Sequence, residues 1–461
     1  MNGTRRVLGF ALAAALCLIL ASAPSLRAQT PAGGQDSGAS KAPPYTMAEY
    51  NAYQACAAEK VPATLIKCLD DFISKYPNSA LLNYVYPLYT QAYGAQKNYT
   101  KVIEYSDKLA AMGDKIDAVT RIQAYLSHAV FYFQMLADPT NKDKGLDKDV
   151  AMAKAAQTAA NDALKALPDA KKPEGATDDA WNKQKTQWQI SGNSLAAQAA
   201  MNAKDWSSAV SSYKAVLGLN PDDLGTNYNL GKAYISMTPS QPMDAFWYFA
   251  KAATSKGATQ KQSDQVKKYL KGQVANYQGG NVCESLVDGE LSELLQLAGS
   301  SAERPGSYSL PSAADIGAVQ KDMTIASVFT ELKAGGDKSK LTWLAACGLE
   351  FPEVPGKVIE VVSGEPLVLK IAFVTSDAEF DAATAPNMDV KVVGQPEAAR
   401  VEKGNPVHFT GTLTAYDPDP AFFLHWDKAK VKAEDIPKEK GTPKKPPVRR
   451  PAAKKPSGAS R

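Results

Sequence analysis

The 461-residue sequence predicts an α+β protein with several domains, in which an α-solenoid is followed by a small five-stranded β barrel. Two observations predict this class. From Tyr45 to about Gly279 apolar residues recur at helical spacing and only short breaks separate the helices, which is typical of antiparallel neighbours. From Val354 onward apolar and polar residues alternate instead, as they do along strands.

Residues 1–28 have the pattern of a secretory signal peptide. Two arginines precede an apolar run over residues 7–23, and Ala28 supplies a small residue at the expected cleavage site. We therefore expect a periplasmic or secreted protein, and the alternative is a protein retained at the membrane by an uncleaved N-terminal anchor. Residues 29–44 are rich in Gly, Pro and Ser and predict a flexible linker.

The helical domain is expected over residues 45–280. Pro62 suits the first position of a helix, and the sequence Tyr76-Pro77-Asn78-Ser79 ends that helix. Later helices are predicted near residues 79–95, 99–112, 117–137, 146–167, 177–201, 205–218, 224–237, 243–254 and 260–278.

Four cysteines follow the signal peptide, and they allow three disulfide connectivities: Cys56, Cys68, Cys283 and Cys347. Export favours pairing, because the compartments outside the cytoplasm are oxidising. We predict a Cys56–Cys68 disulfide, since the two residues lie 12 positions apart on either side of a break in a helical hairpin. Cys283 and Cys347 then form the remaining pair.

A period of 34 residues is present in the helical domain, where Ala197 and Gly231 occupy equivalent places. Residues 228–234, YNLGKAY, closely resemble the first helix of the tetratricopeptide repeat, and residues 204–221, KDWSSAVSSYKAVLGLNP, resemble its second helix. The whole layout is similar to exported bacterial tetratricopeptide repeat (TPR) proteins that end in a small β domain.

This resemblance implies which residues pack the helices together. Small residues would stand where paired helices touch, and larger ones would fill the space around them. The implied packing positions are Ala197, Ala209, Val216, Leu230, Gly231, Tyr234 and Ala245. Because alanine occupies the place that matches Gly231, the resemblance also implies that Gly231→Ala is tolerated.

The resemblance further implies a groove for a partner, since the concave inner wall of the family comes from the first helices. Carried over residue by residue, that wall would contain Ser194, Gln198, Tyr228, Asn229 and Lys232. The implied partner is a protein or peptide of the cell envelope.

Residues 281–353 mix short helical patterns with loops of Gly, Ser and Pro, and we interpret them as a connector. The β domain is expected over residues 354–436. Its predicted strands are residues 357–362, 367–374, 388–393, 407–416 and 422–426. Five strands in so short a segment predict a small closed or nearly closed barrel of the OB-like type.

Charge is distributed unevenly along the chain. Residues 437–461 contain nine Lys and Arg against one Glu, a net charge of +8, and their prolines predict a disordered basic tail. Subtracting this +8 and the +3 of the signal peptide from the total of +4 leaves −7 for residues 29–436. The tail predicts contact with acidic lipid or polymer of the envelope, and export argues against a nucleic-acid partner.

No motif predicts catalysis or a cofactor. The sequence has no Gly-x-Ser-x-Gly elbow, no phosphate-binding glycine loop and no His-Glu-x-x-His. His408 and His425 lie on neighbouring predicted strands, but no third ligand has suitable spacing, so strand histidines without a metal are the preferred interpretation. We expect no catalytic residue, no metal and no cofactor.

The sequence thus favours a non-enzymatic exported scaffold or adaptor that binds another envelope protein through the concave face of a solenoid. The alternative is a carbohydrate- or envelope-polymer-binding module that uses the C-terminal β domain. The two differ in which part of the chain contacts the partner.

Overall fold

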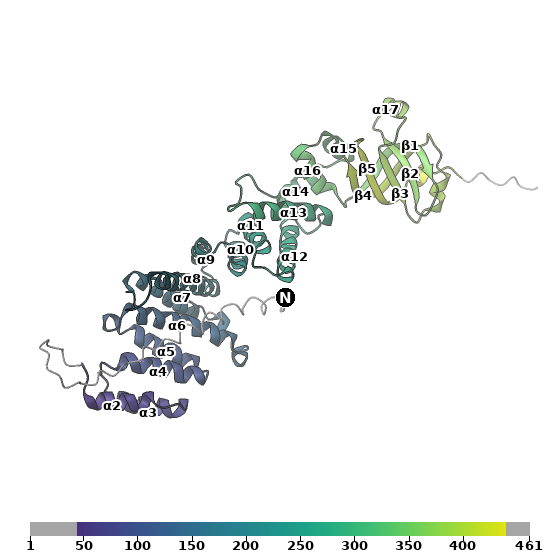
Figure 1. The fold of residues 1–461 in the computed structure, drawn as a ribbon. Coiled ribbons are helices and arrows are strands. Elements are labelled where there is room, and N and C mark those ends of the chain that lie inside the picture. Colours follow the sequence, from purple (N-terminus) through teal and green to yellow (C-terminus); the bar gives the residue numbers. More distant parts are fainter. Residues whose placement is uncertain (1–43, 439–461) are drawn as a thin grey trace, which may run out of the picture. The chain divides into compact units, whose positions relative to one another are not determined.

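A computed structural model describes residues 44–438 of the chain. The signal peptide, nearly all of the predicted linker and all but the start of the basic tail therefore lie outside the described residues. The described part is mostly helical and ends in a closed five-stranded barrel, as the sequence predicts (Figure 1).

In the first part of the chain successive helices from α2 to α11 pack against each other as antiparallel hairpins, and α12 and α13 follow them in the sequence. They are α2 (Met47–Ala57), α3 (Pro62–Lys75), α4 (Leu82–Ala95), α5 (Tyr99–Ala110), α6 (Ala118–Ala137), α7 (Val150–Ala166), α8 (Asp178–Asn202), α9 (Trp206–Leu219), α10 (Leu224–Ser236), α11 (Pro242–Ala253), α12 (Gln260–Tyr277) and α13 (Glu284–Ser300). Short 3₁₀ turns in the connections are η2 (Gly113–Lys115), η3 (Pro139–Asn141), η4 (Leu146–Lys148) and η5 (Leu167–Asp169).

Several of the helices begin at a side chain that caps them. The Thr46 side chain and Glu49 form a capping box at the start of α2, so that two backbone N–H groups gain acceptors. The carboxylate of Asp223 accepts a hydrogen bond of 2.6 Å from the backbone N–H of Thr226 at the start of α10. Asp205 caps α9 in the same way through the N–H of Ser208. Such caps fix the helix starts locally, which is why sequence alone places them well.

The predicted Cys56–Cys68 disulfide is confirmed. It joins α2 to α3 with 5.4 Å between the Cα atoms, and Cys56 is buried beside Leu65 and Leu69. The disulfide therefore holds the first hairpin at its apolar contact.

The chain forms two compact units. The first contains residues 44–273 and 290–309, and the second contains residues 274–289 and 310–438. The second unit includes α14 (Ala313–Lys321), α15 (Ile325–Ala334), α16 (Gly336–Ala346) and α17 (Asp377–Ala382), with 3₁₀ turns η6 (Pro396–Arg400) and η7 (Ala433–Asp435). Its strands are β1 (Glu350–Val362), β2 (Leu367–Phe373), β3 (Met388–Val392), β4 (Pro406–Asp417) and β5 (Phe423–Val431).

The barrel has the strand order β1-β2-β3-β5-β4 and closes through the pairing of β1 with β4. All neighbours are antiparallel except β3 and β5, which are parallel. This is the predicted small OB-like barrel. Alternate residues face inward, so that a single core forms around Trp426.

All five predicted strands are present, but β1 begins at Glu350, well before the predicted start at Lys357. Pro352, Pro355 and Gly356 in this stretch indicate a turn when read from sequence. In the structure a bulge between Phe351 and Val354 interrupts the pairing with β4, so the missing N–H of Pro352 falls where the ladder is already broken.

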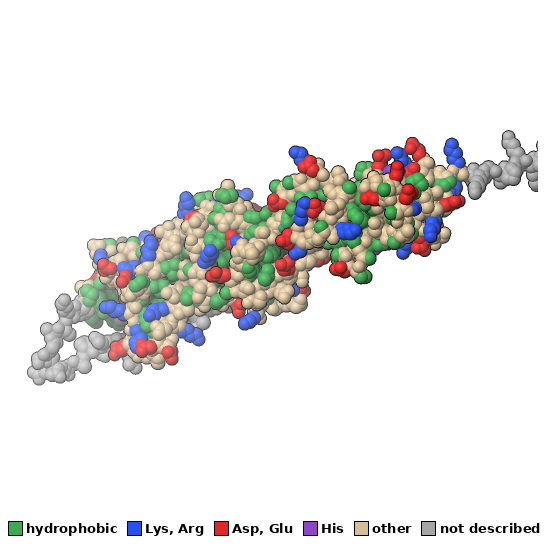
Figure 2. All heavy atoms as spheres, turned by 90° about the horizontal axis from the view of Figure 1, so that it is seen from above, with side chains coloured by type: hydrophobic (Ala, Val, Ile, Leu, Met, Phe, Trp, Pro, Cys, Tyr) green, Lys and Arg blue, Asp and Glu red, His purple; other side chains and the backbone are tan. Residues whose placement is uncertain are grey.

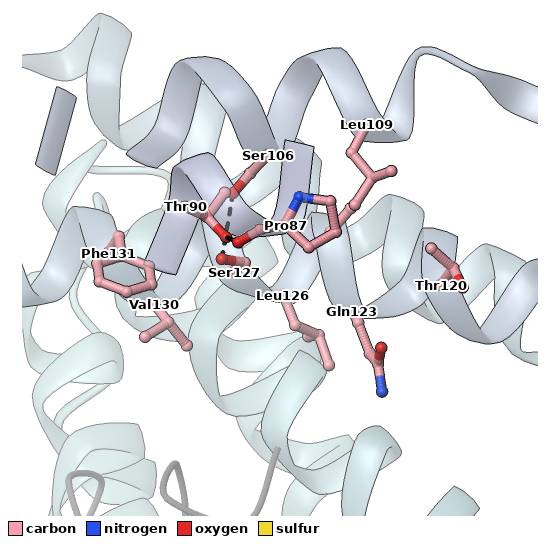
Figure 3. Close-up of a pocket in the computed structure, with 11 residues that line it drawn as sticks. Pro87, Thr90, Ser106, Leu109, Thr120, Gln123, Leu126, Ser127, Val130 and Phe131 are labelled. Carbon is pink, nitrogen blue, oxygen red and sulfur yellow. Dashed lines mark hydrogen bonds between the residues drawn. The ribbon is translucent and has the colours of Figure 1, made fainter. Parts of the chain in front are cut away.

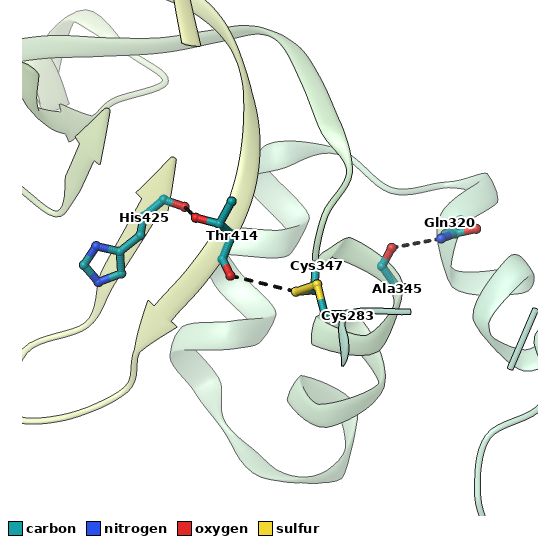
Figure 4. Close-up of a disulfide and its surroundings, with 6 residues drawn as sticks. All are labelled: Cys283, Gln320, Ala345, Cys347, Thr414 and His425. Carbon is teal, nitrogen blue, oxygen red and sulfur yellow. Dashed lines mark hydrogen bonds between the residues drawn. A yellow bond between two sulfur atoms is a disulfide. The ribbon is translucent and has the colours of Figure 1, made fainter. Parts of the chain in front are cut away.

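The second disulfide, Cys283–Cys347, is also confirmed and lies within the second unit (Figure 4). Its Cα atoms are 5.9 Å apart, and it fastens the segment before α13 to the end of α16. The next residue, Gly348, donates its backbone N–H to the carbonyl of Leu413 on β4 at 2.7 Å. Two disulfides in one chain indicate an oxidising, non-cytoplasmic compartment.

Within residues 44–438, no helix combines the length and the apolar character needed to cross a bilayer.

Candidate functional site

A cavity of about 120 Å³ lies among helices α4, α5 and α6 (Figure 3). Most of its lining is aliphatic or aromatic, with a few uncharged polar groups. The lining residues are Pro87, Thr90, Ser106, Leu109, Thr120, Gln123, Ala124, Leu126, Ser127, Val130 and Phe131.

The sequence of α4 and α6 explains why space remains here. Pro87 stands inside α4, where its ring cannot donate a hydrogen bond to the previous turn. The hydroxyl of Thr90 donates to the carbonyl of Pro87 at 2.8 Å. Helix α6 contributes two small side chains to the lining, Ala124 and Ser127, beside larger ones. Small side chains at these positions leave a hollow that larger ones would fill.

Hydroxyl groups of Thr90, Ser106 and Ser127 gather on one side of the cavity (Figure 3). Ser106 lies 3.1 Å from Ser127, with a hydrogen bond between the two hydroxyls, and Thr120 donates its hydroxyl to the carboxylate of Asp117. When Ser106 donates, the hydroxyl proton of Ser127 and the carboxamide of Gln123 remain available, within the described residues, to a group that enters the cavity. The two residues are four positions apart and lie on one face of α6.

The charged and titratable groups nearest the cavity already have hydrogen-bond partners, and among them Asp117 accepts from both the backbone N–H and the hydroxyl of Thr120. His128 on α6 hydrogen-bonds to Asp107 on α5 at 2.6 Å through Nδ1, and Arg121 pairs with Asp114 at 3.2 Å. No charged side chain of residues 44–438 lines the cavity itself. The cavity therefore suits an apolar group with a hydrogen-bond acceptor at its edge.

The five residues of the predicted groove lie on other helices. Ser194 and Gln198 are partly exposed on α8, while Tyr228, Asn229 and Lys232 are on α10. The ring of Tyr228 is only 8% exposed, since it packs against Phe249 and Tyr269, and this burial raises the pKa of its hydroxyl. None of the five lines the α4–α6 cavity.

A second and more open cavity, of about 620 Å³, lies among the end of α7, η5, α8 and α9. Lys185, Gln189 and Asn193 line it from one face of α8, opposite leucines of the neighbouring helices. The predicted wall residue Ser194 immediately follows Asn193 in the sequence. Successive residues point about 100° apart around a helix, so the predicted wall and this cavity lie on different faces of α8.

The seven implied packing positions are all buried in the structure. Gly231 stands where α10 and α11 approach most closely. A Cβ atom added to it would lie 2.7 Å from the ring of Phe249 and 2.9 Å from the backbone oxygen of Ala245. This geometry argues against the expectation that Gly231→Ala is tolerated, because the backbone oxygen of Ala245 cannot turn aside and the helices or the Phe249 ring must shift to admit the methyl group.

The three histidines are each paired with aspartate. His408 hydrogen-bonds to Asp435, whereas His425 lies between Asp389 and Asp417, so His408 and His425 do not converge on one point. Among the residues that the structure describes, no group of three or more His, Cys, Asp or Glu side chains could hold a metal ion.

Both ring nitrogens of His425 are engaged: Nδ1 lies 2.8 Å from Asp389 and Nε2 lies 2.9 Å from Asp417. Partial burial lowers the pKa of the imidazole, but the hydrogen bonds and charges of the two carboxylates outweigh it, so the pKa of His425 is raised above its ordinary value. Both nitrogens donate only when the ring is protonated.

No protein-family model matches this chain, and no curated protein matches it in sequence.

The cavity on α4–α6 is the feature that sequence reasoning missed. A signal was present, because α4 contains no charged residue and has a proline in its interior, both unusual for an exposed helix. The cavity itself depends on which helices meet, and periodicity does not supply that.

Proposed function

We propose that this protein is a non-enzymatic adaptor of the cell envelope, exported by its signal peptide, whose helical region binds a segment of another protein. The observation that supports the proposal is the α4–α6 cavity, an apolar hollow with uncharged hydrogen-bonding groups on helices that begin their hairpins. Ser194, Gln198, Asn229 and Lys232 lie on α8 and α10, which begin the later hairpins of the same series.

The proposal includes the TPR character of the helical region. It is supported by the regular succession of antiparallel hairpins and by the burial of the small residues at Ala197, Ala209 and Ala245, all 0% exposed. Stacked hairpins present one long surface to a partner, which suits an adaptor better than a reaction centre.

The basic tail is proposed to hold the protein near acidic lipid or polymer. It lies outside the described residues except for its first positions, and the support is its charge of +8 over residues 437–461.

The adaptor function can be tested by filling the cavity. Gln123→Trp would place a large ring at the cavity from its rim, and the matched control Gln134→Trp adds the same ring on α6 away from the cavity. A library of displayed peptides is selected against the oxidised full-length mature protein, and the affinities of the enriched peptides are measured by calorimetry.

We expect the parent and Gln134→Trp proteins to bind the enriched peptides alike and Gln123→Trp to bind them at least about tenfold more weakly, because the anchoring side chain loses its site. Melting curves establish that both variants are folded. A selection that enriches no peptide, or equal binding by Gln123→Trp, would overturn the assignment of this cavity.

A further inference from the structure

Charged residues are segregated between the helices around the cavity. Helix α4 contains none, and α6 contains only Arg121, which pairs with Asp114 and Asp169, while His128 of the same helix hydrogen-bonds to Asp107. The helices paired with them are different, since α3 and α5 each contain four charged residues: Lys67, Asp70, Asp71 and Lys75 in α3, and Lys101, Glu104, Asp107 and Lys108 in α5.

A partner's charged group would therefore find no counter-charge in the lining of the cavity, and the carboxylate next to that lining, Asp117, is already hydrogen-bonded to Thr120. Burying an unpaired charge is costly, whereas an uncharged group leaves the existing Asp107–His128 and Arg121–Asp114 pairs intact. On the face shown in Figure 2, acidic and basic side chains of the described residues are interspersed, so no broad field of one sign would guide a charged partner to the molecule there.

The volume of the cavity also limits which side chain can enter it. The cavity of about 120 Å³ is smaller than the roughly 150 Å³ engineered cavity that accepts benzene. An aliphatic side chain fits this volume better than an aromatic ring does. Leu109, Leu126 and Val130 provide the aliphatic surface against which it would pack.

The polar groups of α6 suit a peptide backbone at the edge of the cavity. The carboxamide of Gln123 offers a donor and an acceptor together, and the hydroxyl of Ser127 offers a donor one turn further on. An extended backbone presents its N–H and C=O groups in this way on either side of an inserted side chain.

We propose that the α4–α6 cavity binds an extended, uncharged peptide segment by one inserted aliphatic side chain, with Gln123 and Ser127 hydrogen-bonding to the backbone beside it. This inference rests on the proposed function and specifies the chemistry of its ligand. It distinguishes the uncharged lining of this site from the charged side chains elsewhere on α3 and α5.

The test compares peptides and salt concentrations with the full-length mature protein. The most enriched library peptide is synthesised with its anchor residue as Leu, Phe, Ala, Lys or Glu, and each affinity is measured at about 20 mM and about 300 mM NaCl. We expect Leu to bind best and both charged anchors to bind at least about a hundredfold more weakly. The affinity of the Leu peptide should change less than about twofold with salt.

Two variants test the backbone contacts. Gln123→Met keeps the length of the side chain but removes its amide, and we expect a loss of about three- to tenfold. The control Gln134→Met, on α6 outside the cavity, should bind as the parent does.

The outcomes distinguish the inference about the peptide's chemistry from the proposed adaptor function. Enriched peptides with an aromatic or charged anchor, or affinities that fall about tenfold or more in high salt, overturn this inference and leave the adaptor function standing. If no peptide is enriched, the proposed function itself fails. A neutral oligosaccharide that binds the parent, and that Gln123→Trp fails to bind, would also overturn the inference, since the ligand would then be a glycan.

Discussion

Helix α7 buries its apolar face with alanines, whereas the barrel closes around one large ring. Ala153, Ala156 and Ala160 of α7 are fully buried, and helices in contact through such small side chains have their backbones close together. In the barrel, Trp426 is fully buried between the edges of Phe351 and Phe409. Substitutions that add atoms should therefore lower the stability of the helical part most, and substitutions that remove atoms should lower the stability of the barrel most.

The largest expected effect is that of Trp426→Ala. Removing a fully buried indole from the only core of the barrel in the described residues should cost about 3–5 kcal/mol of the free energy of unfolding. Unfolding in denaturant, followed by the methyl NMR signals of Val390 and Leu413 for the second unit and of Leu69 and Val85 for the first, measures it. We expect the second unit to unfold at a lower denaturant concentration while the transition of the first unit is unchanged; a parallel shift of both transitions would show that the two units unfold together.

The two disulfides allow the units to be compared directly. Cys56–Cys68 closes a separation of 12 residues in the first unit, and Cys283–Cys347 closes one of 64 in the second. The chain-entropy relation gives about 3 kcal/mol for the first and about 4 kcal/mol for the second. Each pair is replaced by two serines, and thermal unfolding is the measurement. Loss of the Cys283–Cys347 disulfide should destabilise the protein more than loss of the Cys56–Cys68 disulfide. A larger loss from the Cys56–Cys68 pair would show that its packing among Leu65 and Leu69 matters more than loop closure.

Gly231→Ala tests the other half of the comparison, sensitivity to added atoms. Alanine gains up to about 1 kcal/mol of helix propensity, but its Cβ would press on the Phe249 ring and the Ala245 carbonyl, and such overpacking costs about 1–3 kcal/mol. We expect net destabilisation by calorimetric melting. The control is Gly218→Ala on α9, where an added Cβ meets nothing within 4 Å and should stabilise. If both variants melted above the parent, α10 and α11 would not be as close as described.

The comparison also shows what sequence could and could not provide. Helix starts such as those at Asp205 and Asp223 depend on neighbours in the chain, and they were predicted to within a few residues. The disulfide in the first hairpin followed from the same local geometry. The first part of β1 was missed because its pairing with β4 joins Glu350 to Thr412, far along the chain, and only that partner makes its prolines acceptable in a strand.

The candidate site was less predictable for the same reason. The wall residues carried over from the repeat lie on α8 and α10, where the resemblance to the repeat is clearest, but the cavity lies among α4, α5 and α6, where the resemblance is weak. Its lining brings Pro87 of α4 together with Ala124 and Ser127 of α6. The spacing of residues within one helix does not predict which residues of another helix it will meet.

The smallest expected effect concerns His425 and how each unit responds to pH. Asp389 comes from β3, Asp417 ends β4, and the ring itself is on β5, so the protonated imidazole ties three strands together. Other charged residues with side chains outside the barrel core near this ring are Lys370 on β2, which pairs directly with Asp389, Lys391 on β3, and Asp427, Lys428 and Lys430 on β5. His128 in the first unit has a single partner, Asp107.

Because the pKa of His425 is raised in the folded protein, folding favours the protonated ring. The stabilisation is then complete below the ordinary pKa of about 6.5 and is lost as the pH rises through the higher folded value. Between about pH 6 and about pH 8.5 the second unit should lose stability, and His425→Gln should remove that part of the dependence. Denaturant unfolding at the two pH values measures both, and a proton NMR titration of the His425 ring checks its pKa directly. Equal pH dependence in the parent and the His425→Gln protein would mean that the two carboxylates hold the ring by geometry alone, and the barrel would then owe its pH response to other groups.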